Sequence, residues 1–347
     1  VSESGTSEQS PSIIYTVDAS SISSGINLIN TYIGKSVNLS HCKVIAFSEE
    51  LAARGISDEI YTLTNDTQIR PSTNIVISKT SARYYLEQSK PLFENLITKY
   101  YEVFSASSSY TGFTSNATIG DFFDSLICHS CEPYAILGGV TNNSTEYTGA
   151  TNSENDSSTK SNSSSLSGQS TAENTGLAIF KDDVLVGELD SIETLCFSII
   201  RNNVDGFLIS VPNPNKSNSY IDLHLTPLTG PKVKVNISNG TPYITLDCRF
   251  TGRIYSMEDG ADYLDLTMLD QISDSCNSYL EATITEYLYK TSKALNSDIN
   301  GFGKIARKNF LTLNQFYDYN WSEKYKDSFF NVTVNSAIRS SSLLTES

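Results

Sequence analysis

The string CHSC at residues 128–131 is the one local cluster among the six cysteines, and its residue types could bind a metal. A four-ligand zinc site needs a second pair of ligands, and His41 and His224 do not supply one at ligand spacing. We therefore expect ordinary thiols, buried or partly buried, with a Cys128–Cys131 disulfide or a metal site as the alternatives. The remaining cysteines are widely and irregularly spaced, unlike a disulfide scaffold: Cys42, Cys196, Cys248 and Cys276.

Two acidic strings are further candidates for metal binding. Residues 258–262 (EDGAD) miss the register of a calcium loop and are interpreted as a solvated loop. Asp182 and Asp183 lie between two apolar runs, so they indicate a hairpin turn. No nucleophile, zincin, Walker or dinucleotide signature occurs at a strand–helix junction. The sequence predicts no catalytic, cofactor-binding or metal-binding residue, no cofactor and no enzyme activity.

The sharpest local string is DINGFG at residues 298–303. Two glycines around an aromatic residue indicate a tight backbone path that drives Phe302 into the core. A phosphate-cradling loop is the functional alternative, but no Lys-Ser/Thr pair follows in the Walker position. The single tryptophan is interpreted as an anchor of the last strand against a long helix. We take as a structural motif Asp298, Gly301, Phe302, Gly303 and Trp321.

The charge of the chain argues against two classes of binding partner. The 347-residue chain has 24 Lys and Arg against 39 Asp and Glu, a formal net charge of −15. This balance argues against nucleic acid and against a polybasic membrane arm, and it predicts that the chain ignores anionic vesicles. No apolar stretch is long enough to span a bilayer. Residues 1–11 are interpreted as a disordered start without the apolar core of a signal peptide.

Residues 12–82 predict an N-terminal α/β domain. Weak alternation indicates a strand over 12–18, and isoleucines at helical spacing indicate a helix from Ile22 to Ile33 that ends at Gly34. Apolar runs at 43–47 and 74–78 predict buried strands with helices between them. Together these elements predict one mixed sheet covered by helices, which the hairpin and helix of residues 176–203 complete.

The next two segments differ in composition. Residues 83–140 predict a helical middle domain, with one helix beginning near Pro91 and another capped by Thr118 and Asp121. Residues 141–175 are rich in Ser, Thr and Asn, so we expect a disordered loop that proteases cut first.

Residues 204–347 predict a C-terminal α+β domain. Alternating runs, a turn at Asn239 and Gly240, and a last strand near 330–338 indicate an antiparallel sheet of about five strands. A long amphipathic helix, about 266–295, should pack on that sheet. The fold class is therefore α+β and multi-domain.

Several strings occur together in order: HCKVIAFSEELAARGI, GLAIFKDDVLVGEL, ETLCFSIIRN and NSDINGFGKIARK with a later tryptophan. Over residues 13–338 the chain resembles the Ger(x)C family, the C subunits (lipoproteins) of spore germinant receptors in Bacillus and Clostridium relatives. It departs from the family in lacking the lipidated cysteine, the signal peptide and the first strands, and in its long 141–173 segment.

The resemblance implies a non-catalytic subunit that triggers spore germination through protein–protein assembly at the spore inner membrane. It implies integral-membrane A and B subunits as partners, and an N-terminal lipid, not present in this chain, that anchors the protein to the outer face of that membrane. A solute-binding lipoprotein that captures an amino acid or another nutrient directly is the alternative. A hydrolase with an unrecognised site is a third hypothesis.

Overall fold

The computed structural model describes residues 13–89, 101, 108–141, 171–257 and 266–339. The helix expected after Pro91, most of the Ser/Thr/Asn-rich segment and the acidic 258–262 string lie outside these residues. In the part of the chain that is described, no helix is both long and apolar enough to cross a membrane.

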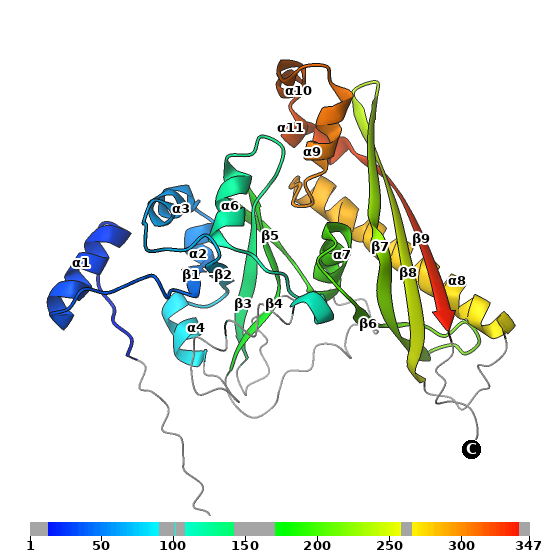
Figure 1. The fold of residues 1–347 in the computed structure, drawn as a ribbon, viewed down its shortest axis with the longest axis horizontal. Coiled ribbons are helices and arrows are strands. Elements are labelled where there is room, and N and C mark those ends of the chain that lie inside the picture. The colour runs from blue at the N-terminus through cyan, green and yellow to red at the C-terminus, as the bar shows by residue number, and fades with distance from the viewer. Residues whose placement is uncertain (1–12, 90–100, 102–107, 142–170, 258–265, 340–347) are drawn as a thin grey trace, which may run out of the picture.

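The first half is built on a five-stranded mixed sheet (Figure 1). Its strands, in spatial order, are β1 (Val44–Ser48), β2 (Asn74–Ser78), β3 (Tyr134–Thr141), β4 (Thr171–Lys181) and β5 (Val184–Leu189). The first three are parallel, and β3, β4 and β5 pair antiparallel. Strands β4 and β5 complete the sheet as expected for the 176–203 segment; the domain boundaries themselves stay a prediction.

Helices cover both faces of this sheet because its strands are apolar on both sides. Ile75 and Ile77 face α2 (Glu49–Ala52), α3 (Ser57–Thr64) and α6 (Ile119–Leu126). Val76 points the other way, toward α4 (Ala82–Gln88) and α7 (Ser191–Arg201). Near-continuous apolar runs are typical of strands buried on both faces, so the runs at 43–47 and 74–78 were sufficient to predict β1 and β2.

Several helix boundaries follow the capping residues in the sequence. Helix α1 (Ile22–Ile33) ends at Gly34, whose φ of 68° is the left-handed conformation that glycine adopts without strain. Helix α7 begins with the expected capping box, in which Asp190 and Glu193 each accept from the other's backbone N–H.

Three expectations for the first half are wrong. Residues 13–18 form no strand, and Ile13 is 69% exposed, because the edge strand β1 pairs only with β2. The segment 83–140 is not all helical, since Tyr134–Thr141 is the central strand β3. The predicted bounds of the loop, 141–175, extend into strands on both sides, because Thr141 is the last residue of β3 and residues 171–175 belong to β4. In each case a sheet partner distant in sequence decides the conformation.

The second half is a four-stranded sheet with a long helix on its inner face. Its strands are β6 (Phe207–Pro212), β7 (Tyr220–Ser238), β8 (Thr241–Met257) and β9 (Phe329–Arg339). Helix α8 (Leu266–Tyr289) continues into a π-helical turn, Lys290–Ala294. Its inner face is buried as predicted at Leu269, Ile272, Cys276, Leu280, Ile284 and Leu288.

The α+β fold class is confirmed, but two details of the second sheet differ from expectation. The sheet has four strands, because β7 runs unbroken through Gly230 and Pro231 by shifting register at two places between Pro227 and Lys232. Strand β9 pairs parallel with β8, since the chain crosses over through α8, α9 (Phe302–Ala306), α10 (Leu313–Tyr319) and α11 (Trp321–Lys324) before it returns.

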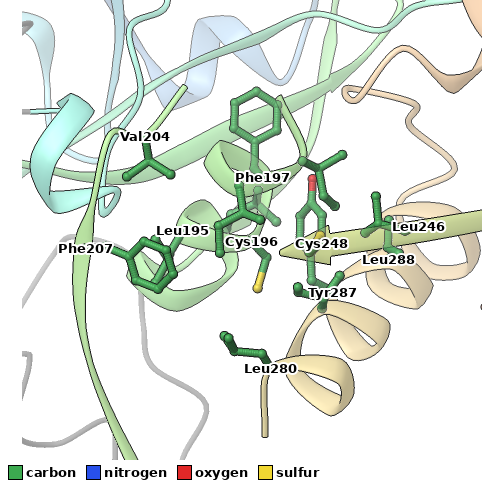
Figure 2. Packing of buried hydrophobic residues seen from close by; sticks show 14 of the residues in the cluster. Leu195, Cys196, Phe197, Val204, Phe207, Leu246, Cys248, Leu280, Tyr287 and Leu288 are labelled. Carbon is green, nitrogen blue, oxygen red and sulfur yellow. The ribbon is translucent and has the colours of Figure 1, made fainter. Parts of the chain in front are cut away.

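One apolar core joins the two sheets. Helix α7 lies between them, and its residues Leu195, Cys196 and Phe197 are fully buried. Figure 2 shows Leu195 and Cys196 between Phe207 of the second sheet and Leu280 and Tyr287 of α8, with Phe197 pointing the other way. The burial of nearly every residue of α7 explains why its sequence is apolar around most of its circumference.

Candidate functional site

The residues that the sequence singled out meet in one buried polar cluster between the two halves. Asp298 is 2% exposed, and its carboxylate accepts three hydrogen bonds. The backbone N–H of Phe302 donates to Oδ1 at 3.0 Å. The backbone N–H of Gly303 and Nε1–H of Trp321 donate to Oδ2 at 2.7 and 2.8 Å. The carboxylate thus fixes the start of α9 and the indole of α11 around one point.

Burial raises the pKa of the Asp298 carboxyl to about 6, against an ordinary value of 3.8. The three N–H donors oppose this shift because they stabilise the charged form, and the nearby charge of Glu132 adds to it. A carboxylate surrounded by donors in this way is already satisfied. It is an organising centre for the loop.

The two glycines of the motif are required for different reasons. Gly301 has a φ of 74°, which side-chain-bearing residues rarely adopt. Gly303 has no room: a Cβ there would lie 2.6 Å from the carbonyl oxygen of Ser130 and from two atoms of the Trp321 ring. Between them Phe302 is 1% exposed, as the sequence predicts.

Trp321 binds the same carboxylate from another helix. Its indole donates to Asp298 and its ring lies 6.0 Å from that of Tyr325, so it anchors the 298–303 turn. Its expected role as an anchor of the last strand stays a prediction. The assignment of these five residues as a structural motif stays a prediction, to which the geometry gives a physical basis.

A second polar cluster, which the sequence did not reveal, lies beside the first. Glu132 is 5% exposed and its Oε1 accepts from Lys181 Nζ at 2.9 Å and from Ser322 Oγ at 2.9 Å. Its Oε2 accepts from the backbone N–H of Asp182 at 2.7 Å. Lys181 Nζ also donates to the Ser322 hydroxyl and, at 3.3 Å, to its carbonyl oxygen.

The two clusters are continuous, because the backbone N–H of Glu132 donates to the carbonyl oxygen of Asp298 at 3.2 Å. Ser297 Oγ also donates to the carbonyl oxygen of Phe180 at 2.6 Å. We call this set the joint: Glu132, Lys181, Ser297, Asp298, Trp321 and Ser322. No local pattern marks Glu132 or Ser322, since their side-chain partners lie 49 to 190 residues away.

The loop that carries Glu132 is stapled by a disulfide between Cys128 and Cys131. The expectation of ordinary thiols is therefore wrong for this pair. The Cα atoms lie 5.5 Å apart, as the CxxC spacing on a turn allows. The other four cysteines are free, and burial raises the pKa of the Cys196, Cys248 and Cys276 thiols, which keeps them protonated.

No group of three or more His, Cys, Asp or Glu residues able to hold a metal ion occurs in the described ranges. A cleft of about 390 Å³ lies between α2 and β5, with Lys79 at its rim. Lys79 Nζ is already paired with Glu188 at 2.5 Å and with Glu49 at 3.6 Å, so the cleft offers no unpaired charge to a nutrient.

Comparison with known proteins identifies the class of protein. The family model described as "Spore germination protein N-terminal domain" matches residues 1–137. The model described as "Spore germination B3/ GerAC like, C-terminal" matches residues 175–342. No curated protein matches the chain. Two matches in chain order define a spore germination protein.

A solved structure has a similar fold. The crystal structure of the GerBC protein aligns with a TM-score of 0.54 over 86% of this chain and 79% of that one, at 16% sequence identity. At this identity the likeness concerns the fold. The chain belongs to the GerAC-like family of germinant receptor C subunits, the family whose motifs its sequence carries.

Proposed function

We propose that this chain is a non-catalytic subunit of a nutrient-germinant receptor and that it acts by assembling with other proteins at the spore inner membrane. The observation that carries the proposal is the match of both halves, in order, to the spore germination family. Integral-membrane A and B subunits are the partners. An N-terminal lipid anchors the protein to the outer face of that membrane, because two acyl chains hold a protein without a spanning helix.

The joint supports a scaffolding role over a catalytic one. The Asp298 carboxylate accepts from its own turn and from Trp321, and the Glu132 carboxylate accepts from Lys181, Asp182 and Ser322 in distant segments. Neither carboxylate borders the cleft beside Lys79. Groups arranged in this way hold two halves in a fixed relation. A subunit that binds several partners at once needs the two halves of its chain held in one relative orientation.

The test is a deletion of the gene in the native organism. We expect loss of germination in response to nutrients, with germination by a non-nutrient trigger intact, and co-purification of the restored protein with two integral-membrane proteins. Germination that continues unchanged without the gene would overturn the proposal. For the solute-binding alternative, calorimetry of the purified chain with amino acids should give no heat, because Lys79 is already paired.

A further inference from the structure

The outer face of the second sheet is exposed and carries charge of the opposite sign to the whole chain. Side chains alternate along β7, β8 and β9, so that Leu223, Ile244 and Val334 point into the core while their neighbours point outward. The outward side chains that carry positive charge are all exposed: Lys232, Lys234, Arg249, Arg253 and Arg339. We call this surface the basic face.

Positive charge on the basic face is in excess. It carries five cations against two carboxylates, Asp222 and Asp247, whereas the chain has 24 against 39. Asp222 accepts from Ser210 Oγ at 2.6 Å, and Asp247 pairs with Arg249 at 3.1 Å. The other four cations form no ion pair with any residue that the structure describes.

The cations are also placed at a cost to the fold. Arg253 on β8 lies directly opposite Arg339 on β9. Like charges facing each other across neighbouring strands destabilise a sheet. An anion that binds between them would remove this repulsion, so the arrangement favours a negatively charged partner.

We propose that the basic face binds an acidic segment of a partner protein, an inference that rests on the proposed function and names the chemistry of one contact. Arginine forks bind carboxylates through two parallel hydrogen bonds. Hydroxyl and amide side chains lie between the cations and supply further hydrogen bonds to a peptide: Thr245, Thr251, Asn331, Thr333 and Asn335.

The same features disfavour other occupants. An anionic bilayer presents an extended negative surface to a chain whose net charge is −15, so the two repel each other. A second copy of the chain would bring a face of the same positive charge. A protein segment that follows the sheet avoids both difficulties.

The experiment uses the full chain and an oligo-glutamate peptide as the probe, at an ionic strength low enough for a Debye length of about 10 Å or more. We expect salt-sensitive binding by the wild type. The double substitution Arg253→Glu with Arg339→Glu should weaken binding at least about tenfold, since it removes both guanidinium forks and adds repulsion.

The matched control is Arg70→Glu with Lys216→Glu. These two cations are exposed, lie outside strands β7, β8 and β9 and form no ion pair among described residues, so the control changes the net charge equally. Equal weakening by the two double variants, or no peptide binding at all, would overturn the proposal. Binding to anionic vesicles but not to the peptide would overturn it in favour of lipid.

A crosslinking experiment in the receptor separates this inference from the proposed function. A photo-crosslinking residue at Thr251, in the middle of the basic face, should capture an acidic segment of a co-purifying subunit. If deletion of the gene abolishes nutrient germination but the crosslink falls on a neutral or basic segment, the proposed function stands and the acidic partner is refuted.

Discussion

Alanine at Gly301 and alanine at Gly303 test two different physical causes within the same turn. At Gly301 the backbone conformation is the obstacle, because φ is 74° while the nearest heavy atom to a new Cβ, Arg201 Nη1, is 3.6 Å away. At Gly303 space is the obstacle, because the Cβ would lie 2.6 Å from the Ser130 carbonyl oxygen and from the Trp321 ring.

The magnitudes follow from these causes. A left-handed conformation costs a residue with a side chain about 1 kcal/mol, so Gly301→Ala should lose that much. Gly303→Ala must displace either the disulfide-closed loop of Ser130 or the Trp321 indole. Overpacking costs about 1–3 kcal/mol, and a weakened Trp321–Asp298 hydrogen bond adds about 1 kcal/mol, so we expect a loss of about 2–4 kcal/mol.

Urea denaturation of both alanine variants measures the two losses, and asparagine at each position is the matched control. Asparagine accepts left-handed φ more readily than alanine, so Gly301→Asn should recover part of the loss. Gly303→Asn should recover nothing, because the larger side chain meets the same atoms. A greater loss at Gly301 than at Gly303, or recovery by asparagine at Gly303, would refute the reasoning. Unchanged stability with lost receptor function would instead mark a contact site.

Three further predictions concern charge. The pKa of Asp298 is raised from 3.8 to about 6 in the folded protein, so the protonated carboxyl stabilises the fold fully below about pH 4. This stabilisation is lost as the pH rises to about 6, and it amounts to about 3 kcal/mol at 1.36 kcal/mol per pKa unit. Urea midpoints across pH should show this slope, and Asp298→Asn should flatten it. Glu132→Ala should cost about 2–4 kcal/mol, because it leaves Lys181 largely buried without its partner, whereas changing both residues together should cost less than the sum. Arg253→Glu should raise the free energy of unfolding by about 0.2–1 kcal/mol, since it converts a repulsive pair with Arg339 into an attractive one; a loss of stability would contradict the assignment of like charges.

Local signals in the sequence were enough for the elements whose conformation is decided locally. The capping residues before α7 and the glycine after α1 fix helix ends through hydrogen bonds and φ angles within a few residues. The Asn239-Gly240 turn likewise has φ values of 50° and 78°, as a two-residue hairpin requires.

Elements decided by distant partners were not predictable in this way. Strand β3 is placed between β2 and β4 by pairing that no local periodicity encodes, and β7 reads as two strands because Gly230 and Pro231 usually mark a turn. The residues of the joint were likewise only partly predictable from the sequence. The 298–303 turn was visible from its glycines, whereas Glu132 was not, because its role depends on Lys181 and Ser322 arriving from elsewhere in the chain.

The parallel pairing of β9 with β8 has a consequence for the order of folding. Strand β8 leaves the ribosome before α8 and the three short helices, and β9 follows all of them, although Tyr243 must pair with Phe329. During that interval the edge of β8 stays unpaired, and such pairings between distant residues form slowly. Asp298, Gly303 and Trp321 all lie in the crossover between the two strands. The first sheet can therefore assemble early, while the contacts of the joint between the two halves form only after most of the chain has left the ribosome.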